Sequence, residues 1–152
     1  MHLTSAAFGE GEPIPVRFTG DGRNVSPPLQ WTDVPAESKS LTLVADDPDA
    51  PAGTWVHWVL YDLPASANGL AEALPRNQYT PDGAKQGQNS FGHLGYGGPC
   101  PPPGNAHRYF FRLYALDTRL DLVPGATRKE VEGAMVGHVL AEAQLMGIYK
   151  RG

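Results

Sequence analysis

Short apolar runs separated by clusters of proline and glycine dominate the pattern along this 152-residue chain. Two of them, 41–45 and 55–61, are rich in β-branched and aromatic residues, which predicts strands that are buried on both faces or nearly so. The segment 107–116 alternates aromatic and charged residues and predicts a third strand. The 15 prolines and 18 glycines lie between these runs rather than in a low-complexity tract, so we expect them to mark turns.

One helix is predicted near the C-terminal end of the chain. Thr127 and Glu130 have the spacing of a capping box, in which each side chain accepts a hydrogen bond from the other residue's backbone N–H. Gly147 is a typical stop signal, so the helix is expected to span residues 128–146. Many strands followed by one late helix predict a mainly β, sandwich-like domain rather than a βαβ fold.

Size and composition indicate a single domain that comprises residues 1–152. A chain of this length buries roughly 70% of the surface that its unfolded form exposes. The hydrophobic content is 41% and the charged content is 18%, which is typical of a protein with a packed core and not of a disordered one. Cys100 is the only cysteine, so no internal disulfide can form.

Charge and hydropathy argue against several classes of partner. The formal net charge is −4 and no run of lysine or arginine is present, so nucleic acid is not expected to bind. No apolar stretch approaches the roughly 20 residues that cross a bilayer, so integral membrane association is not expected either. Residues 1–4 lack the basic and apolar segments with which a signal peptide begins, and we therefore expect a cytoplasmic protein.

An acidic, proline-rich segment, 46–51, follows the first predicted strand. Because a residue that precedes proline is disfavoured in the helical region, Asp47 is expected to be extended. Pro48 and Pro51 stiffen the chain beyond it. The general alternative for such a segment is a solvated acidic turn.

His57 lies among aromatic residues in the second predicted strand. The two-residue period of a strand places it on one face with Trp55, Val59 and Tyr61. A buried imidazole needs hydrogen-bond partners for both ring nitrogens, and Asp47 at the mouth of the same hairpin could supply one. A satisfied core histidine without a further role is the alternative.

The segment 92–104 contains five glycines and four prolines. Loops of this length are usually functional or disordered, and the prolines argue against disorder. Glycines allow backbone N–H groups to line a concavity that binds oxyanions, and Gly97 and Gly98 are the candidates here. The alternative is a long connection that contains no site.

Seven segments carry a resemblance to a known family. They are Asp47-Pro48-Asp49-Ala50-Pro51, Trp55-Val56-His57, Gly97-Gly98-Pro99-Cys100-Pro101-Pro102-Pro103-Gly104, His107-Arg108-Tyr109, Asn24-Val25-Ser26-Pro27-Pro28-Leu29-Gln30-Trp31, Asn89-Ser90-Phe91-Gly92 and Gly147-Ile148-Tyr149. Together they resemble the phosphatidylethanolamine-binding protein family, in its bacterial and archaeal Raf-kinase-inhibitor-like branch. The resemblance covers essentially the whole chain and implies antiparallel strands in a large and a small sheet, with a pocket at one end.

The resemblance also implies a binding site. In the family, an anion of phosphate or phosphoryl headgroup type is surrounded by residues that match Asp47, His57, Gly97 or Gly98, and His107, with Asp49, Pro51, Trp55 and Tyr109 as pocket lining. The implied ligand is therefore phosphate, phosphoethanolamine or another phosphorylated group, and no cofactor is implied. The resemblance further suggests a homodimer. Since eukaryotic relatives act on kinases and other signalling proteins, regulation of a protein through the same surface is an alternative function.

A carboxylate in an anion site needs compensation, because like charges repel strongly in a partly buried pocket. We expect Asp47 to accept a hydrogen bond from His57 or His107 and to favour the protonated ring, which then faces the oxyanion. A proton shared between Asp47 and a phosphate monoester is the other resolution. Backbone N–H groups of Gly97 and Gly98 would add donors that do not depend on pH.

Two enzymatic alternatives use the same region. Asp47, His57 and His107 are a two-histidine, one-carboxylate set that could form an iron or zinc site, but no His-x-x-x-His or Cys-x-x-Cys element is present. Ser90 does not lie in a Gly-x-Ser-x-Gly motif and Cys100 is flanked by prolines, so no nucleophile motif is found. We therefore predict a binding protein with no metal ion and no catalytic residue.

Overall fold

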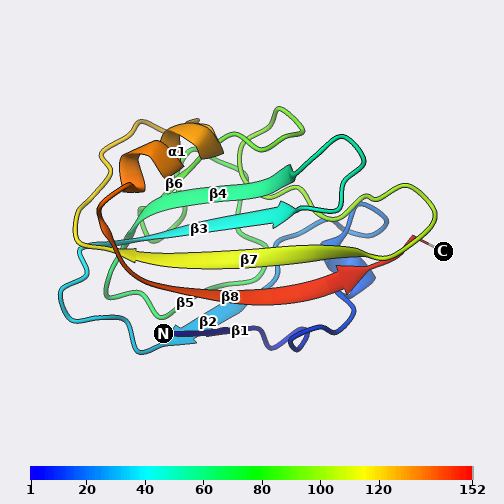
Figure 1. Ribbon diagram of the computed structural model, residues 1–152, viewed down its shortest axis with the longest axis horizontal. Helices are drawn as coiled ribbons and strands as arrows, with labels where there is room; N and C mark the ends of the chain where they lie inside the picture. Colours follow the sequence, from blue (N-terminus) through cyan, green and yellow to red (C-terminus); the bar gives the residue numbers. More distant parts are fainter. Residues whose placement is uncertain (152) are drawn as a thin grey trace.

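A five-stranded antiparallel sheet lies at the centre of the computed structural model, which describes residues 1–151 (Figure 1). In the order of the sheet, its strands are β6 (Lys85–Gln86), β4 (Trp55–Pro64), β3 (Ser40–Asp47), β7 (His107–Leu116) and β8 (Val139–Tyr149). All residues of β3 are buried, because it pairs with a strand on each side and both of its faces are covered. The three strands predicted from the sequence correspond to β3, β4 and β7 and are confirmed.

A smaller antiparallel sheet covers one face of the large one. Its strands, in order, are β1 (His2–Thr4), β2 (Leu29–Thr32) and β5 (Gly69–Leu70), and a short 3-10 helix (Val16–Phe18) lies between β1 and β2. Apolar side chains of both sheets form the main core, among them Leu3, Trp31, Leu43, Trp58, Phe111 and Leu113. The predicted mainly β architecture of two antiparallel sheets is confirmed.

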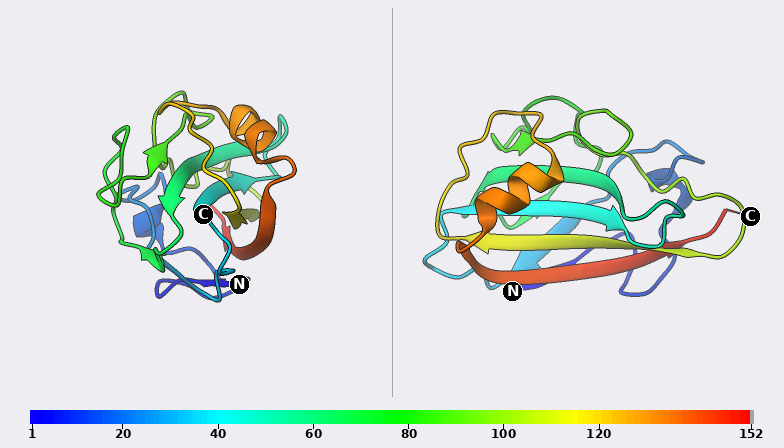
Figure 2. Two further views of the ribbon diagram at one scale, coloured as in Figure 1. Left: turned by 90° about the vertical axis from the view of Figure 1, so that its left-hand side faces the viewer. Right: turned by 45° about the horizontal axis from the view of Figure 1, so that its top comes forward.

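The helix α1 (Arg128–Met135) covers the opposite face of the large sheet (Figure 2). A second apolar cluster lies beneath it and consists of Val59, Tyr61, Leu116, Ala126, Val131 and Met135. The predicted capping box is present, since the N–H of Glu130 donates to the Thr127 hydroxyl and the N–H of Thr127 donates to the Glu130 carboxylate. Among residues 1–151, no helix has the length and apolar character that crossing a bilayer requires.

The helix ends at Met135, so the predicted span of 128–146 is wrong at its C-terminal end. Gly137 has a φ of +82°, a left-handed conformation that turns the chain out of the helix. Residues 139–149 then pair with β7 along its whole length as β8. The backbone hydrogen bonds of that ladder replace those of the expected helix, and Gly147 is a strand residue rather than a stop signal.

A β-bulge in β4 changes which side chains share a face. The pairing of β3 with β4 shifts by one residue next to His57, which leaves β4 with an extra residue there. Val59 and Tyr61 pack beneath α1, whereas Trp55 and His57 line a pocket on the other side of the sheet. The prediction that these four residues share one face is wrong, because the bulge interrupts the two-residue period.

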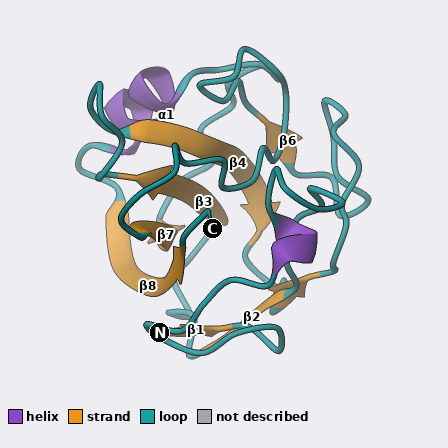
Figure 3. Cartoon of the chain, turned by 90° about the vertical axis from the view of Figure 1, so that its right-hand side faces the viewer, coloured by secondary structure: helices purple, strands orange, loops and turns teal. Residues whose placement is uncertain are grey.

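Three strand ends meet at one end of the large sheet, where the C-terminus also lies (Figure 3). β3 ends there, and β4 and β7 begin there. Residues 48–54, which connect β3 to β4, and residues 91–106, which precede β7, both reach this end of the molecule. The sheet therefore fixes the strand ends, while two connecting segments supply the rest of the wall around them.

Candidate functional site

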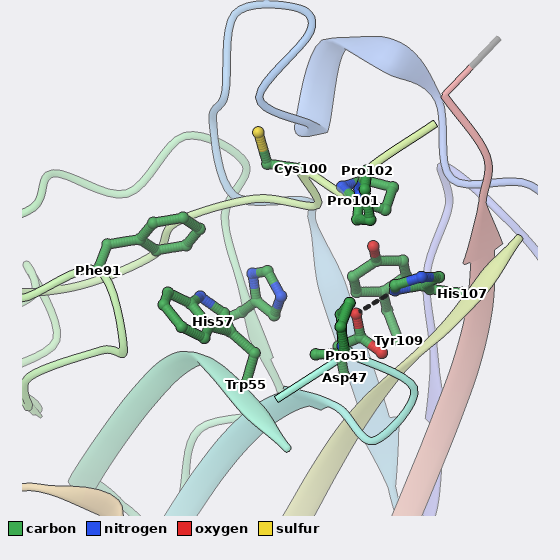
Figure 4. A pocket seen from close by; sticks show the side chains of 11 residues that line it. Asp47, Pro51, Trp55, His57, Phe91, Cys100, Pro101, Pro102, His107 and Tyr109 are labelled. Carbon is green, nitrogen blue, oxygen red and sulfur yellow. Dashed lines mark hydrogen bonds and ion pairs between the residues drawn. The ribbon is translucent and has the colours of Figure 1, made fainter. Parts of the chain in front are cut away.

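Asp47, His57 and His107 lie together at this end of the sheet, each on a different strand (Figure 4). Asp47 is the last residue of β3, His57 lies near the start of β4 and His107 is the first residue of β7. The three residues are 3%, 4% and 9% exposed, respectively. The fold thus brings together three ionisable groups that are distant in the sequence and removes them largely from water.

Asp47 and His107 form a hydrogen-bonded pair, with 2.7 Å between Oδ2 and Nδ1. Since an ionised carboxylate can only accept, Nδ1 of His107 carries the hydrogen and Nε2 is the ring nitrogen left for a ligand. The other oxygen of Asp47, Oδ1, accepts the N–H of Asp49 at 2.8 Å, which fixes the carboxylate in place. Of the two partners that the sequence offered for Asp47, the structure selects His107.

His57 is held by the backbone of the glycine-rich loop. Its Nδ1 lies 2.6 Å from the carbonyl oxygen of Gly97, and its own carbonyl accepts the N–H of Gly97 at 2.9 Å. Because a carbonyl can only accept, Nδ1 carries the hydrogen and Nε2 of the neutral ring presents a lone pair. Burial lowers the pKa of His57, although the Gly97 carbonyl and the charge of Asp47 act in the opposite direction. The ring is therefore neutral at neutral pH.

The ring of Tyr109 lies between the two imidazoles, with centroid distances of 5.3 Å to His57 and 6.4 Å to His107. Its hydroxyl is buried and has no hydrogen-bond partner within residues 1–151, and the same holds for Nε1 of Trp55. A buried polar group that is left unpaired costs about 1–3 kcal/mol. Burial raises the pKa of Tyr109, so its hydroxyl keeps its proton at neutral pH. Both groups are therefore buried donors of residues that line the pocket.

These side chains line a pocket of about 210 Å³ with a largely apolar wall (Figure 4). The ring of Phe91 packs edge-on against Trp55 and His57, at centroid distances of 5.3 Å and 5.6 Å. Predicted lining residues that do line the pocket are Pro51, Trp55 and Tyr109. Lining residues that were not predicted are Ala50, Phe91, Cys100, Pro101 and Pro102. Apart from Ala50, these lie on the long connection before β7, and the course of such a loop cannot be derived from its composition.

Gly97 and Gly98 do not present their N–H groups to the pocket. The N–H of Gly97 donates to the carbonyl of His57, and the N–H of Gly98 donates to Oδ1 of Asn24 at 2.7 Å. Both donors are therefore already paired, and the expected nest of free N–H groups is corrected. The two glycines instead fix the course of the loop and the orientation of the His57 ring.

Asp49 lies beside the pocket rather than in its wall, which corrects its predicted lining role. Its Oδ2 accepts the backbone N–H and Nε of Arg108, each at 2.9 Å, and its Oδ1 accepts Nη2 at 2.8 Å. These bonds lower the pKa of Asp49 to about 2. The pair joins the turn after β3 to the start of β7 and so holds Asp47 and His107 in register.

The rim of the pocket is tied to the C-terminal segment. Nη2 of Arg151 donates to Sγ of Cys100 at 2.9 Å and lies 2.8 Å from Oδ1 of Asp21. The hydroxyl of Tyr149 donates to the same aspartate at 2.6 Å. These contacts hold the proline-rich loop in place from outside the pocket.

The metal alternative requires several ligand side chains to converge on one point. Among residues 1–151, no group of three or more His, Cys, Asp or Glu side chains is arranged to hold a metal ion. The Nδ1 atoms of His57 and His107 are engaged by the Gly97 carbonyl and the Asp47 carboxylate, and the other oxygen of Asp47 accepts the N–H of Asp49.

The chain belongs to the phosphatidylethanolamine-binding protein family, whose model matches residues 4–150. It is 57% identical over 152 residues to a UPF0098 protein of Methanothermobacter thermautotrophicus, and the match covers 100% of both chains. The family and the fold that the sequence motifs predicted are thereby confirmed.

Two solved structures are similar over nearly their whole length. A protein of Chlamydia trachomatis, described as a homologue of phosphatidylethanolamine-binding proteins, is 42% identical with a TM-score of 0.89, covering 99% of this chain and 97% of the other. Escherichia coli YbcL, described as a new member of the mammalian family, is 33% identical with a TM-score of 0.92, covering 99% and 98%. The overall fold is thus common to this chain and both proteins.

Proposed function

We propose that the pocket binds a small anion of the phosphate or phosphoryl headgroup type. The observation that carries the proposal is a set of polar groups that have no hydrogen-bond partner within residues 1–151: Nε2 of His107, the hydroxyl of Tyr109 and Nε1 of Trp55. An oxyanion accepts several hydrogen bonds at once, and bonds from a protonated imidazole are among the strong ones. The name of the family refers to a phosphorylated headgroup, which agrees with this class of ligand.

Asp47 repels an anion unless its charge is balanced. A proton on His107 provides the balance, because the imidazolium donates from Nδ1 to Asp47 and from Nε2 to the ligand. His57 has a different role in binding, since its neutral ring offers a lone pair at Nε2. That lone pair accepts the hydroxyl proton of a singly protonated phosphate, so the two histidines recognise different atoms of the same anion.

Titration with inorganic phosphate and with phosphoethanolamine tests this site. We expect the imidazole NMR signals of His57 and His107 to shift, and the affinity to fall as the pH rises, because an imidazolium donor is needed to offset the charge of Asp47. The His107→Gln substitution removes a charge-assisted hydrogen bond of about 1.5–3 kcal/mol, so calorimetry should show binding weakened roughly tenfold to a hundredfold.

The matched control is His138→Gln. His138, directly before β8, is hydrogen-bonded to Asp117, directly after β7, at the end of the sheet opposite the pocket. Its loss should leave phosphate binding unchanged. The Asp47→Asn variant should show a flatter pH dependence, because an amide carries no charge to balance a protonated His107. Histidine signals that do not move at millimolar phosphate would refute the proposal, and an unaltered pH dependence in Asp47→Asn would assign the aspartate another role.

A further inference from the structure

We propose that His57 is a phosphoryl acceptor, whose Nε2 takes the phosphoryl group of a small phosphate ester or acyl phosphate bound in the pocket. The proposal rests on the anion site described above and adds a covalent step to it. The product is a phosphohistidine, which water then hydrolyses.

The hydrogen bonds of His57 give its ring the form that a nucleophile needs. Nδ1 is locked as a donor by the Gly97 carbonyl at 2.6 Å, so the lone pair of the neutral ring is at Nε2. Edge-on contacts with Phe91 and Tyr109 fix the plane of the ring. A histidine with only a packing role would be expected to have partners for both nitrogens, yet Nε2 has none within residues 1–151, and the residue lines the pocket.

His107 faces the same ligand from the other side of Tyr109 and can donate or accept a proton. The Asp47 carboxylate orients His107 through Nδ1 and leaves Nε2 without a partner within residues 1–151, and His107 lines the pocket. A carboxylate that orients an imidazole in this way fixes its tautomer and stabilises the imidazolium form that proton transfer requires. The hydroxyl of Tyr109 and Nε1 of Trp55 supply donors for the oxygen atoms of the group that is transferred.

Transfer of the phosphoryl group and its hydrolysis need only the ester and water. The Nε2 lone pair of His57 forms a bond to phosphorus while the bond from phosphorus to the ester oxygen breaks, and that oxygen takes the proton from Nε2 of His107. Water then attacks the phosphorus, gives a proton back to His107, and the bond between phosphorus and nitrogen breaks with its electron pair returning to His57. The sum is a phosphate ester and water converted to an alcohol and inorganic phosphate.

Acetyl phosphate is the probe of choice, because its leaving acetate needs no proton. We expect intact mass spectrometry in alkaline buffer to show the addition of one phosphoryl group, and phosphorus NMR together with peptide mapping to place it on nitrogen of His57. The His57→Gln variant, checked by circular dichroism for its fold, should show no adduct. His93→Gln and His138→Gln, which replace histidines outside the pocket, should be phosphorylated to the same extent as the native protein.

His107→Gln separates the two steps. Because it binds phosphate more weakly, it should form the adduct only at a higher concentration of acetyl phosphate. Once formed, the adduct should hydrolyse about a hundredfold more slowly and persist. An adduct that decays at the native rate in His107→Gln would overturn the role of that residue. Phosphate binding in NMR without any adduct, or an adduct on another residue, would overturn the role of His57 while the anion site stands. Failure to bind phosphate at all would instead refute the site itself.

Discussion

Two adjacent aspartates at the end of β3 point to opposite sides of the sheet and have different partners. Asp47 points to the pocket and bonds to His107, whereas Asp46 points to the helix side of the sheet. There, its buried carboxylate lies 3.1 Å from Nε of Arg112 and 2.9 Å from Nη1 of Arg128. Each buried charge thus has a partner, as the cost of burying an isolated charge requires. The alternation of a strand lets one short acidic segment serve both the site and the attachment of α1.

Asp49 provides a test of the electrostatics at the level of a single residue. Its pKa in the folded protein is about 2, below the ordinary 3.8, because Arg108 donates to it. The Asp49 carboxylate therefore makes its full contribution to stability at pH values above the ordinary pKa of 3.8, and this contribution is lost as the pH falls through about 2. Since the side chain is 29% exposed, we expect Asp49→Asn to lower the free energy of unfolding by only about 1 kcal/mol at neutral pH.

Urea denaturation at pH values from neutral to acidic measures this effect. The difference between Asp49→Asn and the native protein should disappear toward the acid end of the range, where the native carboxylate is itself protonated. Asp82→Asn, which alters an exposed turn residue, is the control and should follow the native curve throughout. A constant difference at every pH would mean that the pair with Arg108 does not cause the effect.

Among the elements, local sequence signals determine where α1 begins, whereas strand pairing determines where it ends and β8 begins. The capping box predicted where α1 begins, because a cap depends on residues three positions apart. Where the helix ends depends on β7, whose free edge pairs with residues 139–149. The segment does carry a strand signal, since Ala141, Ala143 and Leu145 alternate with polar residues and pack against the core. Alanine and glutamate are also good helix formers, so the sequence of this segment is compatible with a helix as well as with a strand.

The Thr127→Ala substitution tests the contribution of the cap. It removes the hydroxyl that accepts the N–H of Glu130, and we expect a loss of about 1 kcal/mol in the free energy of unfolding. Thermal and urea denaturation would measure the loss. Phosphate affinity should be unchanged, because α1 covers the face of the sheet opposite the pocket. A weakened phosphate affinity would show that the helix side of the sheet is coupled to the site.

At the scale of the whole molecule, the strands of the site were easier to predict than its loops. Two short apolar runs predicted β3 and β4, and the alternation of aromatic and charged residues predicted β7. The family motifs identified Asp47, His57 and His107, which the fold does bring together. The hydrogen-bond partners of Gly97 and Gly98 could not be predicted, because they depend on how a long loop crosses the end of the sheet. Strand pairing follows a simple period, whereas loop contacts depend on many distant residues at once.

Gly98 closely approaches the last residue of the 3-10 helix and the segment that follows it, and this approach holds the loop over the pocket. A Cβ at Gly98 would lie 2.3 Å from the carbonyl oxygen of Phe18 and 2.6 Å from Oδ1 of Asn24, so Gly98→Ala must displace backbone. We expect it to lower the free energy of unfolding by about 1–3 kcal/mol and to weaken phosphate binding, since the displaced loop carries Pro101 and Pro102 of the pocket wall.

Gly133→Ala is the matched control for this substitution. Gly133 lies in α1 with no atom within 4 Å of an added Cβ, so the change should raise stability by up to about 1 kcal/mol and leave phosphate affinity unaltered. Denaturation and calorimetry on the two variants therefore separate a general effect of the added methyl group from displacement of the loop. If Gly98→Ala were destabilised but bound phosphate normally, the loop would stabilise the fold without shaping the site, and the pocket would depend on the three strand ends alone.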